Sequence, residues 1–202
     1  MKYYTDCLDR DIKNISDEII AEKIFLIYPS YVFRNNEDLQ YNIYKEISEK
    51  FKIPITSIQL CGSGKVGYSY YKLRPFDPLQ SDLDIAIINS NLFNFYMENI
   101  LSQSNDLELI YFSSSGTKKS YTKYISKGWL RPDFMPNITL KTDWFQFFGF
   151  LSNKYSNYFA KINAGIFLSE SIFRNRQKLL IDKYRENKIS ILNDLLNIQK
   201  DK

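Results

Sequence analysis

The sequence predicts an α+β fold, and three observations support this prediction. The 202 residues fit one domain, because a chain of this length can bury roughly 70% of its unfolded surface around one core. A hydrophobic fraction of 44% with 25% charged residues is typical of a folded globular protein. Helical and strand patterns also alternate along the chain. We therefore expect one unit over residues 1–202, with N-terminal helices (1–53), a core (54–140) and a C-terminal helical part (141–202).

Two helices are expected before residue 54. Asn14 or Ser16 can cap the first helix, which should run to about Tyr28. The second should cover residues 35–51, because acidic residues follow its start and Pro54 follows its end. Its apolar residues recur at helical intervals, at Leu39, Ile43, Ile47 and Phe51.

The middle of the chain alternates between strands, loops and helices. Residues 56–61 and the β-branched segment 82–88 predict two strands, joined by a glycine-bearing loop that runs to Ser81. The later patterns predict, in order, a helix at about 91–101, a strand at 107–112, a helix at about 118–126 and a Pro-punctuated loop or edge strand at 128–137.

The C-terminal part is expected to be aromatic, then helical and basic. The segment DWFQFFGFLSNKY (143–155) should be largely buried, and the last 30 residues should be helical. Basic and apolar residues recur there at helical spacing, which indicates either a solvated helix face or a contact surface for nucleotide phosphates or RNA. The basic set is Arg174, Lys178 and Arg185, and the apolar set is Phe173, Leu180 and Tyr184.

Residue types that are absent or rare limit the possible chemistry. The chain has no histidine, which excludes Ser-His-Asp and Cys-His catalysis and histidine-ligated zinc. Cys7 and Cys61 are too few for a disulfide scaffold or a four-thiolate zinc site, and they fit a reducing compartment. No apolar run approaches the ~20 residues that span a bilayer, and acids interrupt the N-terminal segment. We therefore expect a cytoplasmic protein that does not enter a membrane.

The segment GSGK (62–65) suggests a phosphate-binding P-loop, but its surroundings exclude that motif. A P-loop needs a further glycine where this chain has Gln59, and Ser or Thr where it has Val66. The glycines of residues 62–67 can still bring backbone N–H groups close to a phosphate, because glycine has no Cβ. Taken alone, the glycines are better explained by a glycine-rich turn that leaves a strand.

Asp82 and Asp84 are the strongest chemical signal in the sequence. Residues two apart in a strand point to the same side, so both carboxylates share one face. At about 5 Å they repel by roughly 3 kcal/mol at an effective dielectric near 20. A divalent cation would reverse the sign of this interaction, and Mg²⁺ typically binds one or two carboxylates together with substrate phosphates. A solvated strand start is the alternative explanation.

Together, Gly62-Ser63 after a strand and the acid pair in an apolar context resemble the signature of the polymerase beta-like nucleotidyltransferase superfamily. The resemblance covers about 27 residues, 61–87. It implies a mixed sheet core with flanking helices and the transfer of a nucleoside monophosphate from an NTP to an acceptor hydroxyl, with release of pyrophosphate. Metal ions and oriented dipoles supply most of the catalysis in such reactions.

The resemblance also implies a role for each residue of the motif. Gly62 would allow phosphate to approach closely, and Ser63 would hydrogen-bond the terminal phosphates of the nucleotide. Asp82 and Asp84 would be catalytic residues that hold Mg²⁺, as two ions in an active enzyme. Lys65 belongs to the 18-residue stretch between the two halves of the motif, whose cations could line the phosphate channel or be solvated.

The family places a third carboxylate on a later strand, where it activates the attacking hydroxyl. Asp133 is our preferred candidate, and Asp106 and Glu108 are the alternatives. If none of them serves, the chain is a catalytically inactive nucleotide-binding or partner-binding module, such as part of a toxin-antitoxin or phage-defence pair. A nucleic-acid-binding protein without a nucleotide site ranks third, because a net charge of +4 supports it only weakly. The acceptor is open between protein, RNA, a small molecule and a second nucleotide.

Overall fold

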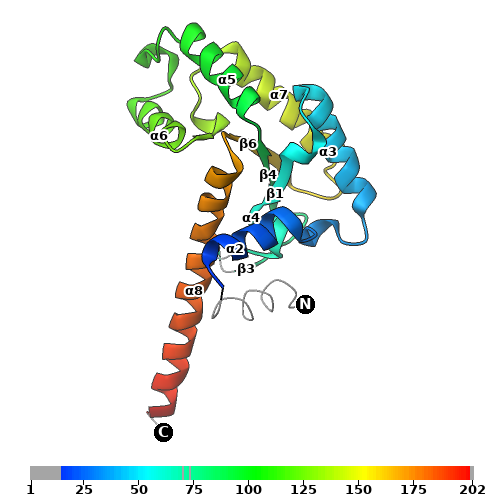
Figure 1. Ribbon diagram of the computed structural model, residues 1–202, viewed down its shortest axis with the longest axis vertical. Helices are drawn as coiled ribbons and strands as arrows, with labels where there is room; N and C mark the ends of the chain where they lie inside the picture. The colour runs from blue at the N-terminus through cyan, green and yellow to red at the C-terminus, as the bar shows by residue number, and fades with distance from the viewer. Residues whose placement is uncertain (1–14, 70, 73, 201–202) are drawn as a thin grey trace.

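A four-stranded mixed sheet lies at the centre of the protein (Figure 1). The computed structural model describes residues 15–69, 71–72 and 74–200, with side chains described up to residue 186. Central strand β4 pairs antiparallel with β1 and parallel with β6, and β5 lies antiparallel on the outer side of β6. The strands are, in spatial order, β1 (Ile58–Cys61), β4 (Asp82–Ile88), β6 (Lys161–Phe167) and β5 (Trp129–Leu130). The expected α+β class with a mixed sheet and flanking helices is confirmed.

Three long helices cover one face of the sheet. They are α3 (Glu37–Phe51), α5 (Ser90–Gln103) and α7 (Thr139–Lys154). Their buried apolar residues form one cluster with Leu83 and Ile85, which alternate with the acids along β4. The alternation of polar and apolar residues in this strand therefore assigns one face to the main core.

The opposite face is only partly covered. Here α2 (Asp17–Glu22), continued by the π-helical segment η1 (Lys23–Ile27), and α8 (Glu170–Lys200) pack against Ala86 and Phe167 in a second apolar cluster. Figure 1 shows that α8 begins beside the sheet and then runs away from it. The acid end of β4 is thus left open on this side.

The shorter elements are η2 (Tyr31–Phe33), η3 (Ile55–Ser57), α4 (Gly62–Val66), β2 (Tyr68–Ser69), β3 (Arg74–Pro75), η4 (Leu109–Tyr111), α6 (Ser115–Ile125) and η5 (Pro132–Phe134).

Most predicted elements are confirmed within a few residues. The first helix ends at Ile27, although the candidate cap Asn14 lies outside the described residues and the Ser16 side chain makes no capping hydrogen bond. The strand expected at 56–61 begins only at residue 58, because the chain first makes a 3₁₀ turn. The Pro-punctuated segment contains the edge strand β5.

The strand predicted at 107–112 is wrong. The chain makes a left-handed turn at residues 105–107, where three φ angles are positive, and then forms the 3₁₀ turn η4. Ser104 holds this turn together, since its carbonyl accepts from the Glu108 N–H at 2.9 Å and its hydroxyl accepts from the Leu107 N–H at 3.2 Å. A short apolar run in a sequence does not distinguish a strand from an irregular segment. In this segment the local hydrogen bonds of Ser104 favour the turn over a strand.

Strand β6 has no counterpart in the sequence-based prediction. Its residues KINAGIF alternate polar and apolar side chains, but Gly165 interrupts the pattern and weakens the strand signal. Gly165 is needed because a Cβ there would lie 2.8 Å from Nε1 of Trp129 and 3.2 Å from the carbonyl oxygen of Leu130. The missing side chain lets β5 and its Trp129 lie directly on β6.

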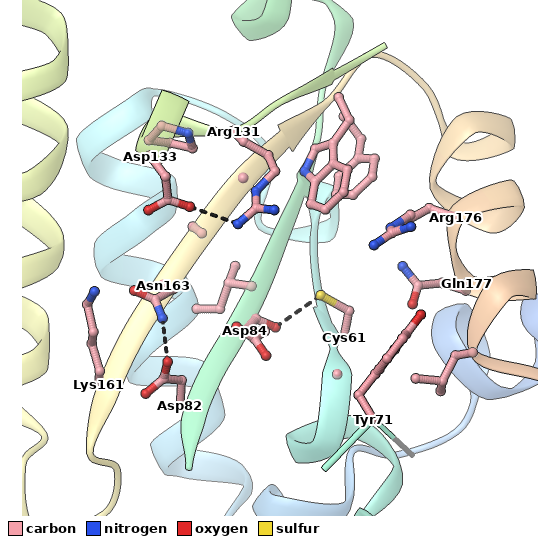
Figure 2. Close-up of a pocket in the computed structure, with 18 residues that line it drawn as sticks. Cys61, Tyr71, Asp82, Asp84, Arg131, Asp133, Lys161, Asn163, Arg176 and Gln177 are labelled. Carbon is pink, nitrogen blue, oxygen red and sulfur yellow. Dashed lines mark hydrogen bonds and ion pairs between the residues drawn. The ribbon is translucent and has the colours of Figure 1, made fainter. Parts of the chain in front are cut away.

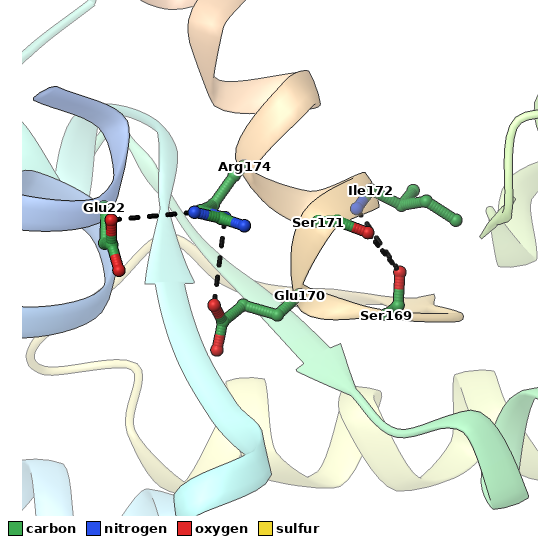
Figure 3. Close-up of polar contacts among 6 residues, drawn as sticks. All are labelled: Glu22, Ser169, Glu170, Ser171, Ile172 and Arg174. Carbon is green, nitrogen blue, oxygen red and sulfur yellow. Dashed lines mark hydrogen bonds and ion pairs between the residues drawn. The ribbon is translucent and has the colours of Figure 1, made fainter. Parts of the chain in front are cut away.

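The basic residues of α8 hold that helix to α2. Arg174 lies 3.6 Å from Glu22 and 3.8 Å from Glu170, as Figure 3 shows. Two further ion pairs join Lys178 to Glu18 and Arg185 to Asp17. The predicted apolar stripe of the helix faces inward, with Phe173 and Tyr184 buried. These cations are therefore largely matched by acids of α2, and an RNA-binding face at these residues has no support in the structure.

The prediction for aromatic segment 143–155 is only partly right. Trp144 and Phe148 are buried in the main core, whereas Phe145 and Phe150 are 39% and 57% exposed. An amphipathic helix on the protein surface must present part of its circumference to solvent.

Two glycine substitutions should have opposite effects on stability. We expect Gly165→Ala to destabilise the protein by about 1–3 kcal/mol, because the new methyl group would clash with Trp129 and the backbone of β5. Gly149→Ala should stabilise it by about 0.5–1 kcal/mol, because nothing lies within 4 Å of the new methyl and alanine favours a helix. Urea unfolding of both variants would measure these changes. A neutral Gly165→Ala would contradict the close packing of β5.

Candidate functional site

The two acids of β4 lie at the open end of the sheet. Asp82 is exposed and Asp84 is partly buried on the same face of the strand. By register, Asp84 lies between Cys61 of β1 and Asn163 of β6, and Asp82 lies beside Lys161. The amide of Asn163 donates to the carboxylate of Asp82 at 3.0 Å. Strands β1 and β6 therefore flank the acids on either side, although these two strands lie far apart in the sequence.

Gly62 and Asp84 are in direct contact. Gly62 has a φ of +65°, and a Cβ on it would lie 2.6 Å from Oδ2 of Asp84. The left-handed conformation favours glycine, and the close approach to Asp84 leaves no room for a Cβ. The glycine loop and the acid pair thus belong to one place in the structure.

The other two glycines of the loop have a packing role. Gly64 lies against Leu83 and Leu60, where a Cβ would make contacts of 3.4–3.5 Å. Gly67 has a φ of +84° and lies against the ring of Tyr31, which a Cβ would approach to 2.7 Å. The absence of a side chain at Gly64 and Gly67 lets α4 pack closely against its neighbours. Of the three glycines, Gly62 alone lines the two cavities beside Asp82 and Asp84.

A cavity of about 480 Å³ opens beside the acid pair (Figure 2). Figure 2 shows Asp133 and Asn163 on one side of Asp84, and Cys61, Tyr71 and Gln177 on the other. The polar and charged residues that line this cavity are Cys61, Tyr71, Asp82, Asp84, Trp129, Arg131, Asp133, Lys161, Asn163, Arg176 and Gln177. Three cations and three carboxylates line the same space, which makes it suitable for a ligand that bears both phosphate and metal.

A second cavity of about 270 Å³ adjoins the first. Ser63 lines it, and no hydrogen bond joins the Ser63 hydroxyl to another described residue. Lys72 and Arg74 contribute positive charge to the same space. The two cavities share Gly62, Tyr71, Asp82, Asp84 and Leu180, so one extended ligand could pass from one to the other across the acids.

Lys65 does not reach either of these cavities. Its side chain is buried, and its ammonium donates to the carbonyl of Tyr28 at 2.7 Å and to the Ser30 hydroxyl at 3.5 Å. Burial lowers the pKa of Lys65 to about 8. The structure therefore separates Lys65 from the other predicted nucleotide-binding residues, because α4 turns its side chain toward η1 rather than toward the carboxylates.

Asp133 does reach the cavity that contains the acid pair. Its carboxylate forms an ion pair with Arg131 at 2.9 Å. The guanidinium of Arg131 is itself fixed by three aromatic rings, Tyr124, Trp129 and Phe134, at 4.9–5.1 Å from their centroids. Asp133 is thus presented to the site in a defined position by the loop that follows β5.

The alternatives for the third carboxylate lie elsewhere. Neither Asp106 nor Glu108 lines the two cavities, and Glu108 accepts a hydrogen bond from Asn105 in the left-handed turn. The strand next to the acids has Asn163 and Lys161 at the positions paired with them. Asp133 is therefore the one candidate of the three that the structure brings to Asp82 and Asp84.

Burial, and after it the nearby charge of Asp82, raise the pKa of Asp84 to about 6. Lys72 and Arg131 oppose this shift. Cys61 is also affected, because burial and the charge of Asp84 raise the pKa of its thiol, which donates a hydrogen bond to the Asp84 carbonyl. A thiol of this kind is a poor nucleophile, so Cys61 has a structural role here.

The environment of Asp84 fits a bound divalent cation. In the described part of the chain its carboxylate has no hydrogen bond or ion pair, although it is close to Asp82 and partly buried. A cation held by Asp82 and Asp84 would neutralise this charge. Among the described residues, no group of three or more acidic, Cys or His side chains is arranged to hold a metal ion. Water and phosphate oxygens would therefore have to complete the coordination, as is usual for Mg²⁺.

The sequence did not predict several of the residues that line the larger cavity. Lys161 and Asn163 were missed together with β6, although the polar-apolar alternation of that strand was a usable signal. Arg176 and Gln177 lie on α8 between residues that pair with α2, and no local pattern marks them.

Comparisons with models of protein families, with curated proteins and with solved structures found no match. No helix in the described residues is both long and apolar enough to cross a membrane.

The metal-free protein should lose stability as the pH rises toward neutrality. Asp84 binds its proton more tightly in the folded state, with a pKa of about 6, than at its ordinary value of 3.8. Its contribution is therefore fully present below the ordinary pKa and is lost as the pH rises to about 6, by up to about 3 kcal/mol.

We expect Asp84→Asn to remove this dependence, so that at neutral pH and without metal the variant is at least as stable as the parent. Urea unfolding in EDTA between about pH 4 and about pH 7 would measure it. The exposed Asp106→Asn serves as the control and should keep the slope of the parent. Identical curves for the parent and Asp84→Asn would show that Asp84 is not desolvated.

Proposed function

We propose that this chain is a Mg²⁺-dependent nucleotidyltransferase of the polymerase beta-like type, which transfers a nucleoside monophosphate from an NTP to an acceptor hydroxyl. The observation that supports it most is the contact between Gly62 and Asp84, which joins both halves of the motif at one site. The mixed sheet, with the acids on a central strand, is compatible with that fold. Two cavities meet at the acids, as a substrate with a triphosphate and a second reactant would require.

The first role of the site is to bind the triphosphate. The Ser63 hydroxyl, which has no hydrogen bond to another described residue, would donate to a terminal phosphate, and Lys72 and Arg74 would offset phosphate charge in the same cavity. Asp82 and Asp84 would hold the cation between this cavity and the larger one. When bound, Mg²⁺ would stabilise the negative charge on the phosphate oxygens of the transition state.

The second role is to place the acceptor. Its hydroxyl oxygen would attack the α-phosphorus, the bond from that phosphorus to the bridging oxygen would break, and pyrophosphate would leave. Asp133 would accept the hydroxyl proton, and Arg131 would hold the Asp133 carboxylate in position through their ion pair. This pair is anchored to aromatic rings, so it needs little reorganisation during the reaction.

The direct test is to incubate the protein with each labelled NTP and Mg²⁺, with protein, RNA and small-molecule acceptors in turn. Release of pyrophosphate together with a labelled product would support the proposal. Asp84→Asn serves as the inactive control. Pyrophosphate release that is unchanged in Asp84→Asn would exclude this site as its origin.

A nucleotide-binding or partner-binding module without turnover is the second candidate. It is favoured by Asn163 and Lys161, which occupy the positions of β6 that pair with the acids. The ion pair between Asp133 and Arg131 also weakens the case for Asp133 as a base. Tight binding of Mg²⁺ and NTP without pyrophosphate release for any acceptor would favour this candidate.

Ser63→Ala should weaken triphosphate binding more than monophosphate binding. A hydrogen bond to a charged group is worth about 1.5–3 kcal/mol, and only the triphosphate would reach Ser63. Calorimetric titration with an NTP and the corresponding NMP, both with Mg²⁺, would measure the difference. Ser126→Ala is a suitable control, because Ser126 is exposed and lines neither cavity. Equal losses for both nucleotides would contradict the assignment of Ser63.

Asp133→Asn should abolish turnover while NTP binding stays within about twofold of the parent, because its role lies in the transition state. Single-turnover kinetics and a binding titration on the same preparation would separate the two effects. Glu108→Gln is the matched control and should behave as the parent. If activity survived in Asp133→Asn but disappeared in Glu108→Gln, the catalytic role would move to Glu108.

A further inference from the structure

Gln177 is a buried amide that the proposed chemistry does not use. It lies on α8, is 6% exposed and lines the larger cavity. No hydrogen bond joins its side chain to any other residue that the structure describes. Figure 2 shows its amide on the same side of Asp84 as Cys61 and Tyr71. Because a largely buried amide that lines a cavity and has no partner among the described residues gains from a new hydrogen bond, this side chain points to a ligand in the cavity.

The position of Gln177 on α8 separates it from the residues that hold the helix in place. Arg174 and Lys178 form ion pairs with acids of α2, on another side of the helix. Arg176 has no ion pair in the described part of the chain, and its guanidinium lies 4.8 Å from the ring centroid of Trp129. Arg176 and Gln177 thus form a polar wall of the cavity, and neither takes part in the ion pairs that hold α8 to α2.

The chemistry of this wall fits a nucleobase. An amide offers one acceptor and one donor side by side, which complements the edge of a base with adjacent donor and acceptor atoms. Tyr71 and Leu180 line both cavities and so connect Gln177 to the Ser63 side. Their ring and apolar side chain offer surfaces against which a flat base can pack.

We propose that Gln177 recognises the base of the bound nucleotide, which would lie beside Tyr71 and Leu180. This inference rests on the proposed function, because it assumes that a nucleotide occupies the site. The triphosphate then extends from the acids toward Ser63, and the base lies along α8. The opposite wall, with Asp133 and Lys161, is left for the acceptor.

The test compares NTPs with inorganic tripolyphosphate, each with Mg²⁺, in binding titrations of the full chain. Gln177→Leu should weaken the preferred NTP about tenfold or more, because it removes both hydrogen bonds to the base. It should also reduce the differences among the four NTPs, and tripolyphosphate affinity should change less than about twofold. Asn175→Leu removes an exposed amide from the same helix and should leave all affinities unchanged.

A stability measurement on the ligand-free protein distinguishes recognition from a structural role. Since the amide has no hydrogen-bond partner among the described residues, Gln177→Leu should melt at the same temperature as the parent or higher. A destabilised variant, an unchanged ranking of the four NTPs, or equal losses for NTP and tripolyphosphate would each overturn the base subsite. If the parent itself bound neither tripolyphosphate nor any NTP with Mg²⁺, the proposed function would fail, and this inference with it.

Discussion

The contact between Gly62 and the carboxylate of Asp84 is the constraint on which the site depends. It requires a residue without a Cβ and with a left-handed φ, so it determines where β1 ends and how α4 begins. Gly64 then fits α4 against Leu83, which belongs to the same strand as the acids. The loop, the short helix and the acid strand therefore form one structural unit, although 18 residues separate the two halves of the motif in the sequence.

The described residues of the fold do not neutralise the charge of Asp84 by an ion pair. Asp84 is partly buried beside Asp82, and burial raises its pKa to about 6. The fold does not compensate with an ion pair to Asp84 from another described residue. Cations are instead arranged around the two cavities, with Lys72 and Arg74 on one side and Arg131, Lys161 and Arg176 on the other. Such an arrangement suits a ligand that supplies both a metal ion and phosphates.

Helix α8 illustrates how one element can serve two purposes. One side is fixed to α2 by ion pairs and buried aromatic residues, and these contacts use most of the basic residues that suggested an RNA surface. Another side presents Arg176 and Gln177 to the cavity. The open end of the sheet is thus bounded by a helix that begins more than 80 residues after the acid pair in the sequence.

Local patterns in the sequence were sufficient for the α+β class, the two N-terminal helices, strand β4 and the shared face of Asp82 and Asp84, because each depends on side-chain periodicity within one element. They were insufficient wherever distant segments meet. Gly165 weakened the strand pattern of β6, and only the structure shows its close packing against Trp129. The segment around Glu108 is shaped by Ser104 rather than by its own strand-like pattern. The tertiary structure alone decided that Asp133 lies at the acids and Lys65 does not, because the direction of a side chain depends on how its element packs. It also decided the neighbours of the acids, since the pairing of β4 with β6 depends on contacts between residues far apart in the chain.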